Sequence, residues 1–283
     1  MAPCCVVEAF CSGNLKGALQ SMKIGVSSSC YYPLETEKSL IKLGEMGVKT
    51  AEVFFNSPSE LQGELFREIC KIRSYYGIEI VSFHPFMSFA EGYFLFSSYS
   101  RRFYDSLETI YKPCFEAAAE LGAKYLVLHG ARGKRTISDE EYAERYYKFN
   151  EEANRFSVSA AHENVVDYAG QNPQFLSYLK RMLGEQFKAV LDIKQARRTG
   201  IAYERFIDEL KESIVHIHVS DFNAYSDCTP PGKDGLFDFP RLFDAMGKIG
   251  YGGKYIIELY SDSFQSDRKL KESFEYLKSL GNL

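Results

Sequence analysis

The chain has 283 residues, a formal net charge of -4, 45% hydrophobic and 25% charged residues. This composition is ordinary for a globular protein with a full core, and the acidic balance argues against nucleic-acid binding, which usually needs a basic surface. No apolar run reaches the roughly 18 residues of a membrane span. Seven cysteines without a C-x-x-C pair predict reduced thiols in a cytoplasmic protein.

The first 21 residues differ from the rest of the chain. They hold three cysteines and two glycines, show little periodicity, and lack the basic start and apolar run of a signal peptide. The first strand-like run begins just after Met22. We therefore expect residues 1–21 to be an extension outside the fold, and residues 22–283 to form one domain.

That domain repeats a single pattern: a helix-like segment, a glycine, and a short β-rich run. Glycine ends a helix in the left-handed conformation without steric cost, and alternating helices and strands predict parallel βαβ units. The glycines in this position are Gly47, Gly77, Gly122, Gly184 and Gly250. Helix starts are predicted at Ser57 and Ser138, each with a glutamate three residues later, and at Asn172 before a proline.

Eight strands are predicted along this pattern. They cover residues 23–28, 50–55, 78–84, 124–129, 157–163, 187–192, 214–219 and 254–259. No linker rich in Pro, Gly or Ser divides them. The length also suits one barrel, which typically needs roughly 250 residues. A single (β/α)₈ barrel of the α/β class is therefore expected, with an open doubly wound sheet as the alternative.

The predicted strand ends are rich in metal-ligand residue types. In such a barrel, catalytic groups project from the C-terminal ends of the strands. These ends carry His84, His129, Glu163, Asp192, His216, His218 and Glu258. Isolated buried charges are kept only when paired or bound to metal, and carboxylates with an imidazole suit Mn²⁺, Mg²⁺ or Co²⁺ better than a structural zinc site rich in thiolates.

Alternation of side chains along a strand predicts which residues face the barrel interior. In the seventh strand, Val215, Ile217 and Val219 are expected to face the helices, which leaves His216 and His218 inside. His162 precedes an inward glutamate, so we expect it to be a hydrogen-bonded core histidine on the helix side.

With these residues the chain resembles the xylose isomerase-like TIM barrel superfamily, which includes ketose 3-epimerases, hydroxypyruvate isomerases, inosose dehydratases and endonuclease IV. The resemblance spans residues 23–280. Its matching phrases are Phe83-His84-Pro85, residues 127–130, His162-Glu163-Asn164, Leu191-Asp192-Ile193, residues 216–221, residues 231–235 with Asp238-Phe239, and residues 250–253 before Ile257-Glu258.

The resemblance implies a metal held by Glu163, Asp192, His218 and Glu258, with Glu163 and Glu258 as the acid/base pair. It also implies the activity of an isomerase or epimerase that moves a proton next to the carbonyl of a sugar or related polyol. Mn²⁺ is the first expectation for the ion, and Mg²⁺, Co²⁺ or Zn²⁺ are alternatives.

Four further residues are candidates for binding the substrate. His84 and His129 either hydrogen-bond sugar hydroxyls or complete a second metal site with Glu163. Lys194 and Gln195 follow the predicted ligand of the sixth strand; Lys194 either binds substrate or neutralises the carboxylates.

Three positions depart from the family pattern. Gln195 stands where a histidine is common, Ala224 where ketose 3-epimerases place an arginine, and Gly235 where a trinuclear nuclease would have an Asp-x-His pair. The metal set is therefore retained while the substrate contacts differ from those of a ketose 3-epimerase. The alternatives are a keto-inositol dehydratase-type lyase, a metal-dependent phosphoester hydrolase similar to endonuclease IV, and a non-catalytic sugar-binding barrel.

Two loops carry additional signals. The aromatic run at residues 85–96 is expected either to stack on a sugar or act as a lid, or to pack against the rim or a partner subunit. Arg132, Lys134 and Arg135 follow the fourth strand, and Arg197 and Arg198 follow the sixth. These cations could bind a phosphate or carboxylate group. Association into homo-oligomers is left open.

Overall fold

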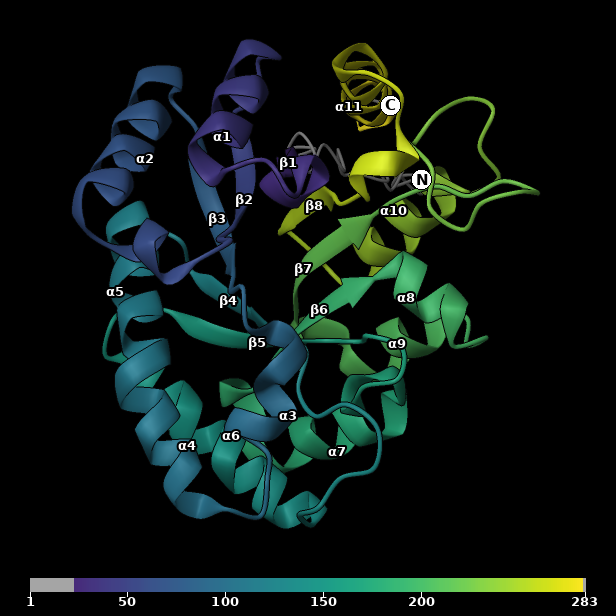
Figure 1. Cartoon of the computed structure of the whole chain (residues 1–283). Coiled ribbons are helices and arrows are strands. Elements are labelled where there is room, and N and C mark those ends of the chain that lie inside the picture. The colour runs from purple at the N-terminus through teal and green to yellow at the C-terminus, as the bar shows by residue number, and fades with distance from the viewer. Residues whose placement is uncertain (1–22, 282–283) are drawn as a thin grey trace, which may run out of the picture.

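Eight parallel strands pair in chain order, and the last pairs back with the first, so the sheet closes into a barrel (Figure 1). The structure, a computed structural model, describes residues 23–281. The strands are β1 (Lys23–Ser27), β2 (Thr50–Phe54), β3 (Glu79–His84), β4 (Tyr125–Leu128), β5 (Ser159–Glu163), β6 (Lys188–Asp192), β7 (Ile214–Val219) and β8 (Lys254–Ile257). The predicted barrel is confirmed, and the open sheet is excluded. The predicted extension, residues 1–21, lies outside the described residues.

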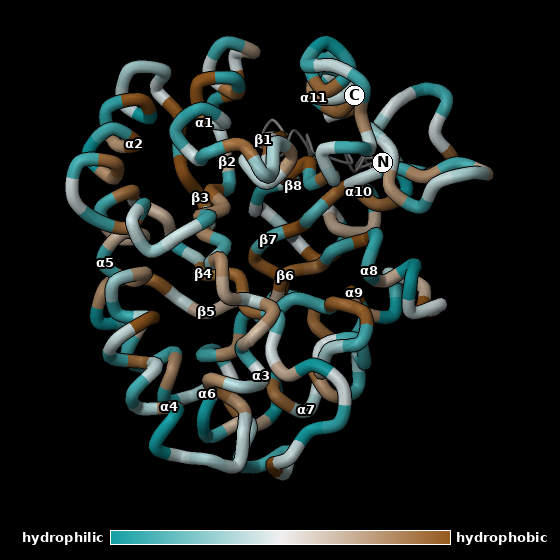
Figure 2. The backbone as a smooth tube through the Cα atoms, viewed as in Figure 1, coloured by the Kyte–Doolittle hydropathy of each residue, from teal (hydrophilic) through white to brown (hydrophobic). Residues whose placement is uncertain are grey.

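Helices surround the barrel (Figure 1). They are α1 (Thr36–Glu45), α2 (Gly63–Tyr76), α3 (Glu91–Phe94), α4 (Ser100–Ser106), α5 (Lys112–Leu121), α6 (Asp139–Asn154), α7 (Pro173–Leu183), α8 (Ile193–Arg198), α9 (Tyr203–Leu210), α10 (Phe239–Lys248) and α11 (Asp267–Leu280). Figure 2 shows hydrophobic residues along the strands and hydrophilic residues on many outer helical turns. Among the described residues, none of these helices has the length and apolar character needed to cross a bilayer.

Local capping explains several helix boundaries. Gly77 and Gly122 end α2 and α5 in the left-handed conformation, with φ of 62° and 75°. The Ser138 side chain accepts a hydrogen bond from the third residue of α6, and the Asn172 side chain caps α7. These starts agree with the prediction from sequence.

The helix start predicted at Ser57 is wrong. Residues Pro58–Leu61 form only a 3₁₀ turn, and α2 begins at Gly63. The Ser57 hydroxyl pairs with Ser59 rather than capping a helix. The Glu60 carboxylate accepts a backbone hydrogen bond from Asn56, so this acid ties down the loop instead of closing a capping box.

Inside the barrel, a layer of apolar side chains lies next to the layer of polar side chains at the C-terminal ends of the strands. Val127, Ala161 and Val190 form a small buried cluster there, two residues before His129, Glu163 and Asp192 respectively. Val215 also packs against this cluster, so its predicted orientation toward the helices is wrong. The β6–β7 register shifts between Ala189 and Val190, which interrupts the simple alternation. Ile217 and Val219 join the larger core as expected.

Candidate metal centre

Four side chains from four neighbouring strands converge at the C-terminal end of the barrel. Each of Glu163, Asp192, His218 and Glu258 offers one donor atom, and these atoms all lie within 4.8 Å of one another. A divalent ion about 2.0–2.3 Å from its ligands would space opposite donors by up to about 4.6 Å. The four side chains therefore need only small adjustments to surround one ion.

Asp192 is held in place by its own backbone surroundings. Its Oδ1 accepts a hydrogen bond from the Gln195 backbone N–H at 2.9 Å and so caps α8. The Asn164 side chain clamps the Asp192 backbone by donating to its carbonyl at 2.9 Å and accepting from its N–H at 2.6 Å. These contacts leave Asp192 Oδ2 buried and without a hydrogen-bond partner.

His218 is oriented from both sides of its ring. Its Nδ1 lies 3.0 Å from Glu163 Oε1, and its Nε2 lies 3.1 Å from Glu52 Oε2. Burial opposes the charged imidazolium, but Glu52, Glu258 and Glu163 favour it and hold the pKa of His218 well above its ordinary value. In the metal-free site, a proton on this ring therefore offsets part of the carboxylate charge.

Glu52 is the buried carboxylate that the sequence analysis missed. Its side chain is fully buried and contacts Ser27, Ser82, His216 and His218 at 2.8–3.2 Å. Burial opposes ionisation, yet the two imidazoles hold the pKa of Glu52 well below its usual range. The signal was present in β2, because apolar residues flank Glu52 on both sides and alternation turns it inward.

Glu163 and Glu258 differ in their exposure and in their polar contacts. Glu163 is 3% exposed, and its oxygens lie 3.0 Å from His129 and His218. Glu258 is 16% exposed; its Oε2 lies 3.4 Å from Lys194 Nζ, and no hydrogen bond to its Oε1 occurs among the described residues. Burial opposes ionisation of both acids, but His218 keeps the pKa of each below its ordinary value.

The donor set can hold a divalent cation. It supplies three carboxylates and one imidazole, which are ligands that Mn²⁺, Mg²⁺, Co²⁺ and Zn²⁺ accept. Among the described residues, Asp192 Oδ2 is buried without a hydrogen-bond partner, and the nearest cation is the Lys194 ammonium at 3.5 Å. Burial, together with the neighbouring Glu163 and Glu258, raises the pKa of Asp192 to about 6 although Lys194 opposes this rise. A cation at this point would relieve the repulsion among the carboxylates.

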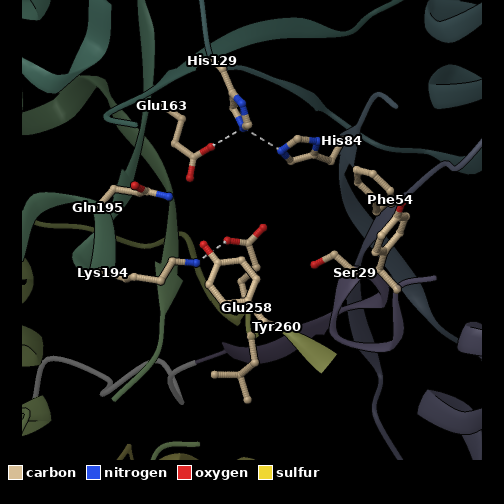
Figure 3. A pocket seen from close by; sticks show the side chains of 11 residues that line it. Ser29, Phe54, His84, His129, Glu163, Lys194, Gln195, Glu258 and Tyr260 are labelled. Atoms are coloured by element: carbon tan, nitrogen blue, oxygen red, sulfur yellow. Dashed lines mark hydrogen bonds and ion pairs between the residues drawn. The ribbon is translucent and has the colours of Figure 1, made fainter. Parts of the chain in front are cut away.

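A cavity of about 240 Å³ opens beside these acids (Figure 3). Glu163 and Glu258 line it, and so do all four residues predicted to contact substrate: His84, His129, Lys194 and Gln195. The structure thus brings together the predicted acids and the predicted polar contacts around one space.

The apolar wall of this cavity comes from other loops than expected. Tyr32, Phe54 and Tyr260 line it, whereas no aromatic residue of the 85–96 segment does. In that segment Phe96 is buried and stacks on Tyr142 with ring centres 3.8 Å apart, and Phe89 is 72% exposed. Of the two expectations for this segment, packing against the barrel is the one that Phe96 fits.

Lys194 is buried among the carboxylates. Its Nζ lies 3.5 Å from Asp192 Oδ2 and 3.4 Å from Glu258 Oε2, and 4.8 Å from the centre of the Tyr260 ring. Burial disfavours the ammonium, but Asp192 and Glu258 hold the pKa of Lys194 well above its ordinary value. Gln195 accepts a hydrogen bond from the Val166 backbone, and Figure 3 shows its amide nitrogen directed into the cavity.

His84 and His129 form a second cluster with Glu163. The Nε2 atoms of the two histidines lie 2.9 Å apart, and donor atoms of all three residues lie within 4.8 Å of one another. Burial lowers the pKa of His84, while Glu163 outweighs burial and raises the pKa of His129. Both earlier readings of this pair, sugar contacts and a second metal site, fit this geometry.

Other predicted positions lie outside the cavity. His162 is fully buried and hydrogen-bonds the Tyr142 hydroxyl at 2.8 Å, as expected of a core histidine. Arg198 pairs with Asp227 at 2.6 Å. Ala224 is exposed on the loop after β7. A Cβ at Gly235 would overlap the Asp221 carboxylate, so this position has no room for a side chain.

Comparison with known proteins finds a relative in sequence and several relatives in structure. An uncharacterized protein of Methanocaldococcus jannaschii is 24% identical over 270 residues, which are 90% of each chain. A D-tagatose 3-epimerase-like protein has a similar structure, with a TM-score of 0.73 and 24% identity over 92% of this chain and 97% of that chain. The probable 3-DHS dehydratase of petrobactin synthesis from Bacillus anthracis gives a TM-score of 0.71 and 14% identity over 90% of this chain and 98% of that chain.

These structural likenesses, each below 25% identity, show a shared fold. The family model described as the xylose isomerase-like TIM barrel matches residues 41–280, which is most of the chain. The chain belongs to the xylose isomerase-like TIM barrel family.

Proposed function

We propose that this protein is a metal-dependent isomerase or epimerase that moves a proton next to the carbonyl of a small sugar or related polyol. The observation that carries the proposal is the convergence of Glu163 and Glu258 with Asp192 and His218 beside one small cavity. Likeness to a D-tagatose 3-epimerase-like protein is in keeping with this reaction class.

Glu163, Asp192, His218 and Glu258 would hold the ion, for which Mn²⁺ is our first proposal. When bound, a divalent ion polarises the substrate carbonyl and makes the neighbouring C–H bond more acidic. The protein's own part is to hold the four donors in place, which it does through Asn164 behind Asp192 and Glu52 behind His218.

Glu258 is the better placed of the two acids to remove the proton. Glu258 is more exposed than Glu163, and its Oε1 accepts no hydrogen bond from the described residues. Burial opposes the ionisation of Glu258, but His218 lowers the pKa of Glu258 and so keeps it ionised near neutral pH. In an epimerisation Glu258 would keep the proton that it removes, and Glu163, which comes from β5 across part of the barrel, would pass a different proton to the other face. That proton would come from His129, 3.0 Å from Glu163; burial opposes a charge on His129, but Glu163 raises the pKa of His129. In an isomerisation Glu258 would instead return the proton to the adjacent carbon.

The remaining cavity residues would orient the substrate. His84, His129, Lys194 and Gln195 present ring nitrogens, an ammonium and an amide to sugar oxygens. Tyr32, Phe54 and Tyr260 offer apolar surface to the carbon-bound face of a ring. The cavity volume of about 240 Å³ favours a single small molecule over a polymer.

Dehydration is a second candidate reaction. Removal of the same proton can expel a hydroxyl group on the next carbon, and the Lys194 ammonium, 3.4 Å from Glu258, is placed to hold the departing oxygen. Both reactions share the first step and differ in whether water leaves.

One experiment separates these reactions. Elemental analysis of the purified protein would identify the ion, and a panel of ketoses, inososes and hydroxy acids would be incubated with Mn²⁺ in deuterated water. We expect solvent deuterium on the carbon beside the carbonyl, with product mass showing whether water has been lost. Turnover with no deuterium uptake and no dependence on Glu258 would contradict proton transfer by this residue.

A further inference from the structure

A second cavity lies between the loop after β3 and the loop after β4. Its volume is about 520 Å³. Its lining includes Arg102 at the start of α4, and Arg132, Lys134 and Arg135 from the β4 loop. We call this space the basic cleft.

The basic cleft carries an excess of positive charge. Four cationic side chains line it, and no aspartate or glutamate is among its lining residues. Arg135 pairs with Asp139 at 2.6 Å from outside the lining. Within residues 23–281, no carboxylate oxygen lies within 4.0 Å of a charged nitrogen of Arg102, Arg132 or Lys134. Like charges gathered in one concavity raise the local concentration of an anion.

Two of the guanidinium groups are held in position by aromatic rings. Arg102 lies 3.6 Å from the centre of the Tyr93 ring, and Arg135 lies 4.1 Å from the centre of the Phe175 ring. Arg135 Nη1 is buried and has no hydrogen-bond partner within residues 23–281. A planar guanidinium with free N–H groups matches the oxygens of a phosphate or carboxylate, and fixing it beforehand lowers the entropy cost of binding.

The walls of the basic cleft are fastened to each other. Glu91 accepts a hydrogen bond from the Gly130 backbone at 2.5 Å, which joins α3 to the end of β4. A Cβ on Gly92 would come within 3.1 Å of Ala131 Cα, so glycine permits this close approach. Further along, the Ser98 N–H donates to the Thr136 hydroxyl at 3.2 Å. These contacts hold the two loops that carry the cationic side chains in fixed positions relative to each other.

The basic cleft is close to the candidate metal centre. Arg132 follows His129 by three residues, so their Cα atoms are at most about 11 Å apart. Arg132 also lies 5.9 Å from the Tyr168 ring, which in turn contacts His129 edge-on with ring centres 5.4 Å apart. Through Tyr168, Arg132 of the basic cleft is thus one contact away from His129, which lines the cavity at the metal centre, although the two cavities share no lining residue.

We propose that the basic cleft is a binding site for a phosphate-type oxyanion, with Arg102, Arg132, Lys134 and Arg135 as its donors. The oxyanion belongs either to a phosphorylated sugar whose other end reaches the metal centre or to a separate phosphate. The first source rests on the proposed function, whereas oxyanion binding itself does not.

Calorimetric titration of the metal-free protein with inorganic phosphate, at constant ionic strength, tests the site directly. We expect saturable binding that weakens at least about tenfold in the Arg132→Ala/Lys134→Ala double variant. Arg102→Ala, a single change on the opposite wall, should also weaken it. The control is Arg67→Ala, which removes an exposed arginine of α2 elsewhere on the protein. No saturable binding, or equal loss in the Arg67→Ala control, would overturn the proposal.

A second experiment, which compares KM values, distinguishes the two sources of the oxyanion. If a phosphorylated sugar spans both places, a phosphorylated ketose should show a lower KM than the same ketose without phosphate. The double variant should abolish that difference while kcat changes little. If a separate phosphate is the ligand, the two KM values should agree and phosphate titration should still give a saturable curve. Absence of any ketose turnover would bear on the proposed function alone, because the phosphate titration requires neither metal nor activity.

Discussion

Glu52 and His218 are joined across the barrel, with Glu52 Oε2 3.1 Å from His218 Nε2 although 166 residues separate them in the chain. Because Nε2 faces Glu52, Nδ1 is the nitrogen that faces Glu163, Asp192 and Glu258. A carboxylate behind a ligating imidazole fixes the ring and raises its basicity. We therefore regard Glu52 as a positioning residue for the proposed metal site.

Removing Glu52 should weaken metal binding without touching a ligand. Glu52→Ala is expected to lower Mn²⁺ affinity by about 10–100-fold in calorimetric titration, because His218 loses its support. Glu52→Gln keeps the shape of the side chain and should fall between the wild type and Glu52→Ala.

The matched control is Ser82→Ala, which removes the contacts of Ser82 with Glu52 at 2.8 Å and with His216 at 3.2 Å. It leaves the contacts of Glu52 with both histidines in place. It should bind Mn²⁺ nearly as the wild type does. Equal affinities for Glu52→Ala, Glu52→Gln and Ser82→Ala would show that Glu52 has no role in positioning His218.

Glu258→Gln should separate binding from chemistry. The amide keeps the shape and some metal affinity but cannot accept the proton, so we expect turnover to fall at least about 100-fold while substrate still binds. Steady-state kinetics and direct titration with substrate measure the two effects. Glu79→Gln is the control, since Glu79 starts β3 at the opposite end of the barrel and pairs with Lys254 there. An unchanged rate in Glu258→Gln would remove this residue from the mechanism.

Metal binding should release protons. The metal needs His218 Nδ1 and Asp192 deprotonated. Burial opposes the proton on His218, but the surrounding glutamates raise the pKa of His218 well above 6.5, and burial raises the pKa of Asp192 to about 6. Protons therefore compete with the ion most strongly at low pH. Mn²⁺ affinity should be higher near pH 8 than near pH 6, with proton release detected by calorimetry in buffers of different ionisation enthalpy. An affinity independent of pH would contradict this account.

Glu91 should make folding stability depend on pH. Burial raises the pKa of this fully buried acid from 4.5 to about 8, and its Oε1 has no hydrogen-bond partner in the part of the chain that the structure describes. The folded state thus binds the proton more tightly than the unfolded state. The stability contributed by this group is complete below pH 4.5 and is lost as the pH rises through about 8.

Glu91→Gln carries no titrating proton, so it should gain stability relative to the wild type as the pH rises from about 5 to about 8. Urea denaturation at the two pH values measures this difference in the free energy of unfolding. Glu116→Gln, an exposed change on α5, should leave the difference near zero. A constant offset between Glu91→Gln and the wild type would mean that Glu91 does not titrate in this range.

Deleting residues 1–21 should leave thermal stability and activity nearly unchanged. The barrel closes through β1 and β8, and the paired residues begin at Lys23 with Lys254. The described pairs that close the barrel therefore all lie after the deleted segment. Thermal denaturation and the activity screen would test this, and a large loss in either would show that the segment has a structural role.

The sequence by itself determined the order of the elements and most of the candidate site. Glycine after five helix-like segments and short β-rich runs predicted the βα units, and alternation placed Glu163, Asp192, His218 and Glu258 on the inner face. Parallel strands in a barrel all end at the same mouth, so residues that end different strands must meet. Convergence of the four donors within 4.8 Å follows from that geometry.

Only the tertiary structure decided the contacts that cross the barrel. Glu52 reaches the two histidines of β7, Lys194 lies between two carboxylates, and Tyr32 and Phe54 line the cavity. The position of Val215 also depends on a register shift between β6 and β7. Alternation states which face a residue occupies, but the stagger and tilt of the strands set which residues from distant strands share a layer. Those quantities belong to the closed sheet, and no local pattern encodes them.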